Sequence, residues 1–314
     1  MKKYSETGDT MKETRKAEDR IVIRNVSKNY GSKRALEGID LTIDRGMFGL
    51  LGRNGAGKTT LMKTLAALHP KSSGEISVCG VPIDKSREIR SMTGYLPQDF
   101  SMYPSMKVDE CLDYLGVLSG MDKKLRKERI DMLLKKVNLQ SHRKKKVKQL
   151  SGGMLRRLGI AQALLHDPKV LIVDEPTAGL DPEERIRFRN LLGEVAEDRI
   201  VILSTHIVGD IEASCEKLAI LNDGRILWKG EVRDLVSEAE GRVWTASVDS
   251  RFLPQVKSAY TVTGMVMQGS STQVRIVSDS KPDIAGAREE APNIEDAYIY
   301  CLYKNNCITD GGED

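Results

Sequence analysis

The residues best suited to chemistry begin with a glycine-rich stretch, GRNGAGKT, at residues 52–59. It fits the pattern GxxxxGK[ST], in which glycines let backbone N–H groups surround phosphate oxygens without obstruction by side chains. Lys58 would then reach the β- and γ-phosphates of a nucleotide, and the Thr59 hydroxyl would bind Mg²⁺. The alternative is a glycine-rich turn with a solvated lysine. An apolar run before the stretch and a helical pattern after it favour the phosphate loop, because the positive end of the helix would face the same anion.

A second apolar run ends in two carboxylates, in the stretch VLIVDEPTAGLD at residues 170–181. Asp174 would hold the metal through a water molecule, and Glu175 would polarise an attacking water as general base. The alternative is a pair of carboxylates that merely closes a strand. Because a strand followed directly by Asp-Glu-Pro is unusual, the sequence favours a site for nucleotide hydrolysis.

Composition restricts the class of protein. The 314 residues are 40% hydrophobic, enough for one large domain and a smaller one. The net charge of +4 gives no global field that would favour nucleic acid as a partner. The apolar runs are far shorter than 18 residues, and the polar start has no apolar segment, so we expect neither a membrane span nor a secretion signal. The cysteines lack CxxC spacing, which favours reduced structural thiols. They are Cys79, Cys111, Cys215, Cys301 and Cys307.

The elements that must position these residues follow an α/β pattern. Short β-branched segments at residues 21–30 and 38–43 indicate strands, and apolar spacing of three and four predicts helices between about Val108 and Lys136. Continuous apolar runs at 169–176 and 199–206 are typical of parallel strands that are buried on both faces. This alternation predicts an α/β core with a helical insertion.

The pattern changes after about Leu235. Three short strands are expected at residues 242–249, 260–268 and 272–279, and residues 294–303 read as a helix or a strand. These segments predict a small α+β appendage that follows the core.

Four further motifs stand in register with the phosphate loop and the acidic pair. From about Ile21 to Gly230 their order and spacing closely resemble those of ABC-type ATPases. LSGGM resembles the signature, YLPQD the Q-loop with Gln98, AGLD the D-loop and LSTH the switch histidine, while Tyr30 stands where the family places an aromatic ring on adenine. The motifs occupy residues 150–154, 95–99, 178–181 and 203–206.

The resemblance implies a P-loop NTPase of ABC type, with an antiparallel β subdomain, the helical insertion and the C-terminal α+β appendage. We therefore expect a disordered lead at 1–19, an ATPase domain at 20–234 with its helical insertion at about 99–160, a C-terminal domain at 235–304 and a tail at 305–314. It also implies ATP and Mg²⁺ as cofactors. It assigns catalysis to Lys58, Glu175 and His206, and the binding of Mg²⁺ to Thr59, Gln98 and Asp174. The residues that it assigns to ATP binding are Tyr30, Asn54, Gly55, Ala56, Gly57, Lys58, Thr59, Thr60, Gln98, Ser151, Gly152, Gly153 and Asp181.

The signature is a second phosphate-binding feature, because Ser151, Gly152 and Gly153 precede a helix. In the family this feature serves the ATP bound by the opposite subunit, which implies a homodimer or heterodimer whose closure excludes water. Gln162 and Met47 stand where the family often has arginine and glutamate, and neither belongs to the chemistry. Because Glu175, His206 and the signature are all present, both sites of a homodimer should hydrolyse ATP.

Two classes of ABC ATPase are possible. One drives a membrane transporter through separate permease subunits at the cytoplasmic face of the membrane, and the other is soluble and acts in DNA repair, chromosome structure or translation. The spacing between Gly52 and Asp174 leaves no room for a long coiled coil, which favours transport. Residues 287–302 resemble the "P-x-L-E-D-x-F" close of ATPases paired with ABC-2-type permeases, mostly exporters, and residues 101–112 resemble the same group. The basic run at 142–148 is interpreted as a solvated face, not a nucleic-acid site.

Overall fold

The computed structural model describes residues 19–308. The predicted lead lies outside the described residues except for Asp19, as does the predicted tail beyond residue 308. The chain divides into two compact units. The first ends at His206 and also contains Asp223–Arg225, and the second contains Ile207–Asn222 and the residues from Ile226 onward. The domain boundary expected near residue 235 stays a prediction.

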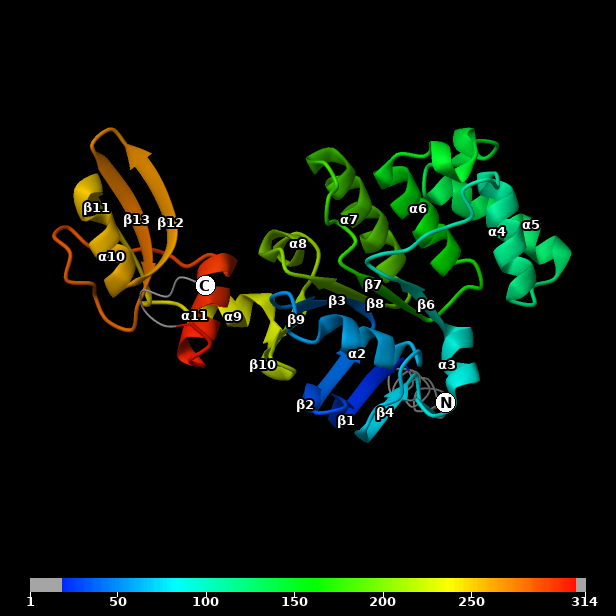
Figure 1. The fold of residues 1–314 in the computed structure, drawn as a ribbon, viewed down its shortest axis with the longest axis horizontal. Coiled ribbons are helices and arrows are strands. Elements are labelled where there is room, and N and C mark those ends of the chain that lie inside the picture. Colours follow the sequence, from blue (N-terminus) through cyan, green and yellow to red (C-terminus); the bar gives the residue numbers. More distant parts are fainter. Residues whose placement is uncertain (1–18, 309–314) are drawn as a thin grey trace, which may run out of the picture. The chain divides into compact units, whose positions relative to one another are not determined.

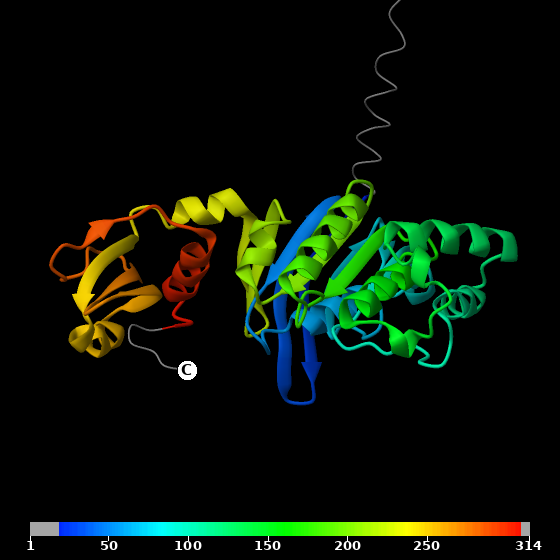
Figure 2. The same ribbon diagram turned by 90° about the horizontal axis from the view of Figure 1, so that it is seen from above.

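An antiparallel sheet opens the first unit, with the strand order β2-β1-β4-β5. Alternating apolar residues of β1, such as Ile21 and Ile23, are buried on one face of the sheet. Gly31 turns the chain into β2 with a φ of 58°, a conformation that favours glycine. Figure 2 shows β1 and β2 (blue) as a hairpin. The strands are β1 (Arg20–Tyr30), β2 (Lys33–Asp44), β4 (Ser73–Val78) and β5 (Val81–Pro82).

A parallel sheet carries the first unit's strands in the order β3-β8-β7-β6 (Figure 1). All residues of β7 and β8 are buried, as their continuous apolar runs predict. The parallel register brings the carboxyl ends together, because Leu51 lies opposite Thr205 and Asp174 lies opposite Ser204. The strands are β3 (Gly46–Leu51), β6 (Thr93–Leu96), β7 (Val170–Asp174) and β8 (Ile200–Thr205).

Helices flank this sheet and form the expected insertion (Figure 1). In the insertion, α4 packs against α5 and α6, and α5 packs against α6. Asp122 caps α5 by accepting hydrogen bonds from the backbone N–H groups of Lys124 and Leu125. The helices are α2 (Lys58–Leu65), α3 (Ser86–Met92), α4 (Val108–Leu118), α5 (Lys123–Lys136), α6 (Gly152–Ala163) and α7 (Pro182–Ala196).

The basic run of residues 142–148 has two roles in the insertion. Its lysines are exposed, as the solvated-face interpretation predicts. However, Lys144 Nζ lies 2.7 Å from Asp109 Oδ2, and Arg143 contacts both Asp109 and Asp131. Two of the basic side chains therefore bind the insertion together.

The second unit contains its own antiparallel sheet, with the order β12-β13-β11-β14. The three predicted C-terminal strands are confirmed, and the segment at 294–303 is a helix, α11 (Ile294–Lys304). A helix before β12, α10 (Leu253–Ala259), was not predicted. The remaining elements are α8 (Val208–Glu212), β9 (Lys217–Asn222), β10 (Arg225–Glu231), α9 (Val232–Glu238), β11 (Val243–Asp249), β12 (Thr261–Gln268), β13 (Ser271–Val277) and β14 (Arg288–Glu289).

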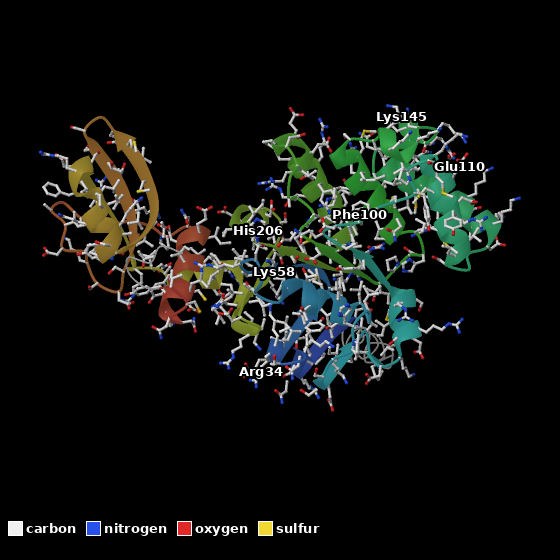
Figure 3. All side chains as sticks on the ribbon, in the orientation of Figure 1. Arg34, Lys58, Phe100, Glu110, Lys145 and His206 are labelled. Atoms are coloured by element: carbon white, nitrogen blue, oxygen red, sulfur yellow. The ribbon has the colours of Figure 1, made fainter. Side chains whose placement is uncertain are left out.

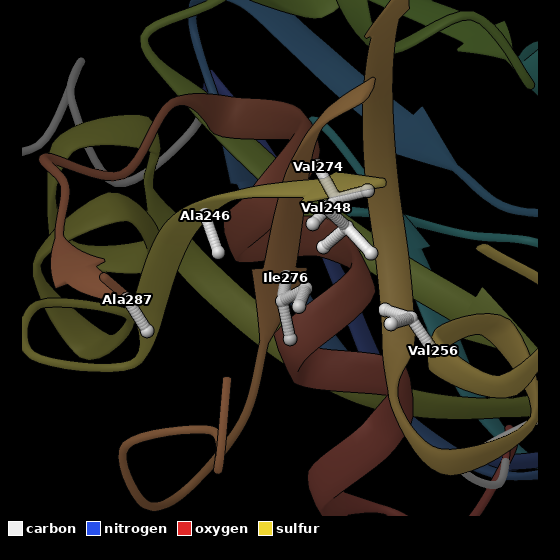
Figure 4. Close-up of a cluster of buried hydrophobic side chains, with 6 residues drawn as sticks. All are labelled: Ala246, Val248, Val256, Val274, Ile276 and Ala287. Carbon is white, nitrogen blue, oxygen red and sulfur yellow. The ribbon is translucent and has the colours of Figure 1, made fainter. Parts of the chain in front are cut away.

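A separate hydrophobic core stabilises this sheet. Val256 of α10 meets alternate residues of β11 and β13 on one face of the sheet (Figure 4). The cluster consists of Ala246, Val248, Val256, Val274, Ile276 and Ala287.

Candidate nucleotide-binding site

The glycine-rich loop joins the end of β3 to the start of α2, as its sequence predicts. Gly55 and Gly57 have φ values of 85° and 107°, in the region where side chains are strained. A Cβ added at Gly55 would meet no atom within 4 Å, so the backbone conformation, not space, requires this glycine. No side chain of residues 19–308 caps α2, which leaves its first N–H groups directed at the loop.

Three charged or ionisable side chains lie in contact in a row at the ends of β7 and β8. Lys58 Nζ lies 3.1 Å from Glu175 Oε1, and Glu175 Oε2 lies 3.1 Å from His206 Nδ1 (Figure 3 labels Lys58 and His206). Lys58 also donates to the carbonyl oxygens of Gly52 at 2.6 Å and Arg53 at 3.1 Å. Lys58 and Glu175 are both buried. Buried charges of this kind require partners, and each of the two is the other's partner.

Asp174, the last residue of β7, precedes Glu175 and is fully buried. Its Oδ1 accepts a short hydrogen bond from the Ser204 hydroxyl. Its Oδ2 has no hydrogen-bond partner among the described residues. Because Mg²⁺ prefers oxygen ligands, this carboxylate oxygen fits a magnesium ion or its bound water, together with Thr59 and Gln98 of the adjacent cavity.

A cavity of about 590 Å³ opens over the phosphate loop. It brings together most of the side chains that the sequence predicts for ATP. The lining residues are Tyr30, Lys33, Arg34, Ala35, Asn54, Gly55, Gly57, Lys58, Thr59, Thr60, Gln98, Glu175, Asp223 and Gly224. Ala56 is buried behind the loop, where its carbonyl accepts a hydrogen bond from the Gly224 N–H at 2.9 Å.

Five of the lining residues were not predicted, namely Lys33, Arg34, Ala35, Asp223 and Gly224. The first three lie just after Tyr30, separated from it by Gly31 and Ser32, so their closeness to the predicted aromatic was a usable signal. The last two form the turn between β9 and β10, far from every motif, and no local pattern marks them.

The Tyr30 ring is held from two sides at the rim of this cavity. Its hydroxyl lies 2.7 Å from His69 Nδ1, and Lys28 Nζ lies 4.9 Å from the ring centroid. Tyr30 is 43% exposed, so one ring face remains accessible for stacking.

The signature lies elsewhere. In the part of the chain that the structure describes, Ser151, Gly152, Gly153 and Asp181 do not line the cavity over the phosphate loop. Ser151 caps α6 by accepting from the Met154 N–H at 3.3 Å, and its side chain and Gly152 are exposed. The structure therefore groups the phosphate loop, Gln98 and Glu175, and separates the signature from them.

Gly153 and Asp181 are tied to one glutamate. A Cβ added at Gly153 would lie 2.7 Å from Glu184 Oε2, and Asp181 caps α7 by accepting from the Glu184 N–H at 2.8 Å. The signature and the D-loop therefore both contact Glu184.

The signature helix also holds the segment after Gln98. Arg156 donates to the Gln98 carbonyl at 2.6 Å and lies over the ring of Phe100. A Cβ at Gly159 would lie 2.6 Å from Leu96 Cδ1 and 2.8 Å from Phe100 Cζ, so a larger residue here would displace these two side chains. Burial lowers the pKa of Arg156 from its ordinary value.

Known proteins are similar to this chain in sequence. A family model described as "ABC transporter" matches residues 36–178. The uncharacterized ABC transporter ATP-binding protein YxlF of Bacillus subtilis (strain 168) is 36% identical over 255 residues, 81% of this chain and 85% of that protein. The Nod factor export ATP-binding protein I of Burkholderia lata is 37% identical over 224 residues, 70% of this chain and 74% of that protein.

A solved structure agrees in fold. The dimeric post-hydrolysis state of the ATP-binding cassette MJ0796, bound to ADP and Pi, matches with a TM-score of 0.61 and 25% identity, covering 67% of this chain and 98% of that chain. The chain therefore belongs to the family of ABC transporter ATP-binding proteins. It is an ATPase of the ABC class that serves a transporter, with the predicted P-loop fold.

Two further expectations can be compared with the structure. All five cysteines are free thiols, as their spacing predicts. Within residues 19–308, no helix combines the length and the apolar character that a membrane crossing requires.

Proposed function

We propose that this chain is the ATP-hydrolysing subunit of an exporter, and that two copies bind ATP between them to drive a separate permease at the cytoplasmic face of the membrane. The proposal rests on the contacts that run from Lys58 through Glu175 to His206, in which Lys58 and Glu175 line the nucleotide-sized cavity. A carboxylate held this way can accept a proton, and a lysine beside it can hold phosphate.

In this mechanism Lys58 turns from Glu175 to the β- and γ-phosphates of ATP. Glu175 then accepts the proton of the attacking water as the bond between the β- and γ-phosphates breaks, which yields ADP and phosphate. His206 holds the second carboxylate oxygen and contacts the γ-phosphate. The Tyr30 ring stacks on adenine, while Asn54, Gly55, Ala56, Gly57 and Thr60 surround the phosphates.

Mg²⁺, bound by Thr59, Gln98 and Asp174, would neutralise charge on the phosphate oxygens. Two features of the chain support its place here. Asp174 Oδ2 is buried without a partner among the described residues, and both Thr59 and Gln98 line the cavity.

The separated signature supports the two-chain arrangement. Ser151 and Gly152 are exposed at the start of α6. An exposed helix start with a hydroxyl and glycines is suited to bind the γ-phosphate held by a second copy, with Asp181 beside it. The related cassette MJ0796 is dimeric and holds ADP and Pi.

Export is supported by the relatives and by the end of the chain. The relative from Burkholderia lata is named for Nod factor export. Residues 292–298, PNIEDAY, resemble the close of ATPases that work with ABC-2-type permeases. The cargo is chosen by the permease, so we assign none.

Glu175→Gln tests the catalytic role. The amide cannot accept the proton, so ATP hydrolysis should fall by about 10² to 10⁴ while Mg-ATP still binds. The variant should therefore remain dimeric in ATP during size-exclusion chromatography. Glu183→Gln is the matched control, because Glu183 is exposed on α7 and pairs only with Arg187 among the described contacts. Wild-type hydrolysis by Glu175→Gln would remove Glu175 from this role.

A further inference from the structure

The PNIEDAY motif near the end of the chain has a defined structural role within the second unit. Asn293 caps α11 by accepting from the Asp296 N–H at 2.9 Å, and Asp296 Oδ2 accepts from the Asn293 N–H at 2.9 Å. This reciprocal capping box fixes the first turn of the helix. The side chain of Asp296 is nevertheless 1% exposed, which is far more burial than a helix cap requires.

The buried carboxylate also binds both strands of the neighbouring hairpin. Its Oδ1 accepts from the hydroxyl of Thr263 on β12 at 2.8 Å. Its Oδ2 accepts from Arg275 Nε of β13 at 2.8 Å and forms an ion pair with Nη2 of the same side chain at 2.7 Å. Arg275 also donates to the carbonyl of Ala291, just before the helix. Three donor atoms of the sheet, the Thr263 hydroxyl and two nitrogens of Arg275, therefore hold the start of α11 on the sheet, on the face opposite the core of Figure 4.

The rest of α11 packs against α8 and α9 of the same unit. Its buried residues lie on more than one side, as expected for a helix between a sheet and other helices. Lys304 at its end lies 3.5 Å from Glu238 of α9. The buried set is Ile294, Ala297, Tyr298, Tyr300, Cys301 and Leu302.

Helix α8 begins only two residues after His206. Ile207 is its N-cap residue, and the Ile207 carbonyl accepts from the Asp210 N–H at 3.1 Å. Val208 and Ile211 are buried, although the helix has only five residues. So short a helix has little stability of its own, and its position depends on the elements that pack against it.

We propose that Asp296 is a positioning residue for ATP hydrolysis: it fixes α11, α11 packs against α8, and only Ile207 separates α8 along the chain from His206, the partner of Glu175. The inference rests on the proposed roles of Glu175 and His206. It assigns to the C-terminal domain the task of stabilising the hydrolytic arrangement without touching the nucleotide.

The test compares Asp296→Asn with Asp249→Asn in the full-length chain. Asp249 pairs with Arg251 at 2.9 Å in the same unit, but this pair is at the surface and is remote from α11 in sequence. Thr263→Val is a milder second variant, since it removes one hydrogen bond and leaves the ion pair with Arg275 intact. Nucleotide binding, kcat and KM are measured for each variant.

Two readouts follow α8 directly, without reference to activity. Hydrogen exchange of residues 207–215 should become about tenfold faster in Asp296→Asn, because α8 loses its fixed support. Labelling of Cys215 by iodoacetamide should rise by a similar factor of about ten. Cys215 is 7% exposed, and burial raises the pKa of its thiol to about 12, so it reacts only when this region opens. Cys111 of α4 is the internal control.

The kinetic signature is a fall in kcat of roughly tenfold with little change in KM for ATP, because a misplaced His206 weakens catalysis and leaves the nucleotide contacts intact. Thr263→Val should show the same pattern at smaller amplitude. The double variant Arg275→Gln, Asp296→Asn should recover part of kcat, since it replaces an unmatched ion-pair partner by two neutral hydrogen-bonding groups.

Unchanged exchange of residues 207–215 with wild-type kcat in Asp296→Asn and Thr263→Val overturns the inference, even if exchange of residues 288–304 rises. Should Asp296→Asn unfold the C-terminal sheet, the comparison rests on Thr263→Val. The outcome for Glu175→Gln is separate: normal hydrolysis there refutes the proposed function, whereas loss of hydrolysis there with unaffected Asp296 variants refutes only this inference.

Discussion

Glu175 and Asp296 are both buried carboxylates beside a basic side chain, yet their surroundings differ. Glu175 directly follows β7 and has a φ of 44°. It lines a cavity of about 590 Å³ and contacts Lys58 and His206. Asp296 lies in a helix cap, accepts from Thr263, Arg275 and a backbone N–H, and does not line that cavity.

The difference in surroundings indicates which of the two carboxylates is suited to catalysis and which to holding the structure together. A non-glycine residue at positive φ carries backbone strain, and such strain often accompanies functional sites. Glu175 has partners that can move to a ligand, because Lys58 lines the cavity and the His206 side chain is 41% exposed. Asp296 has donors fixed by two strands and by its own helix, so its bonds persist only if the domain stays intact.

The largest loss of ATPase activity is expected from substitutions of Lys58 and Ser151. Lys58→Ala loses its phosphate contact and leaves Glu175 without its cation, and Ser151→Arg blocks the signature offered to a second copy. Each homodimer should lose ATPase activity by about 10² or more. A mixture should regain activity, because a mixed dimer gathers both defects in one site and leaves the other with an intact Lys58 and Ser151.

Restored activity on mixing is the decisive measurement. ATP-dependent cross-linking of the mixed pair is measured beside it, because hydrolysis could still fail if both sites must act together. A wild-type rate for either homodimer alone would show that the phosphate loop and the signature do not meet across an interface.

A second expected effect concerns Mg²⁺, which we propose is bound at Asp174, next to Glu175, and not at Asp296. Asp174→Asn should raise the Mg²⁺ concentration needed for half-maximal hydrolysis by roughly 10- to 100-fold, because the buried carboxylate oxygen is lost. Titration of ATPase activity with MgCl₂ measures it. Ser204→Ala is the matched variant: it removes the donor to Asp174 Oδ1 and keeps the charge, so its shift should be smaller. Equal magnesium requirements in Asp174→Asn and wild type would contradict the assignment.

Sequence and structure differ in what each can supply for these two regions. The phosphate loop, Asp174, Glu175 and His206 could be predicted, because each lies in a short motif at the end of a strand. Their mutual contacts could not, since the parallel register that brings β7 and β8 together is a long-range property. Asp223 and Gly224 were missed for the same reason, as they reach the cavity from a turn with no motif of its own.

In the C-terminal unit, the three strands were predictable from their alternating patterns, but α10 was not. The 294–303 segment was ambiguous between helix and strand because its apolar residues are nearly continuous. Its capping box, with Asn293 and Asp296, was the local signal that could have decided it. Packing of α11 on α8, about 90 residues earlier in the chain, has no signature in either segment.

Truncation after residue 234 removes Asp296 together with its whole domain. Nucleotide binding should persist within about threefold, because every phosphate-contacting motif precedes the cut. Hydrolysis should fall by roughly tenfold, since α8 then lacks α11. Isothermal titration with a non-hydrolysable ATP analogue and steady-state kinetics separate the two effects. A truncated chain that is folded by circular dichroism yet no longer binds the nucleotide would show that the expected boundary near residue 235 is wrong.

The smallest effect concerns Asp109, a third carboxylate with limited exposure, which resembles Asp296 in being tied to basic side chains. Burial alone would raise the pKa of Asp109, but the hydrogen bonds and charges of Lys144 and Arg143 outweigh it and hold the pKa below its ordinary value of 3.8. Because the folded-state pKa is the lower one, the stabilisation is fully present well above pH 3.8. It is lost as the pH falls through the folded-state value.

Asp109→Asn should therefore melt below wild type at pH 7, by an amount that corresponds to less than about 1 kcal/mol because the basic partners are partly exposed. The difference should shrink as the pH is lowered past 3.8, since wild type then protonates the same carboxylate. Differential scanning fluorimetry at pH 7, 5 and 3.5 measures it. Asp84→Asn, in a pair 3.5 Å from Lys71, should show a smaller difference at pH 7. A gap between Asp109→Asn and wild type that stays constant down to pH 3.5 would mean that the Asp109 charge does not stabilise the insertion, and that its contacts act only through shape.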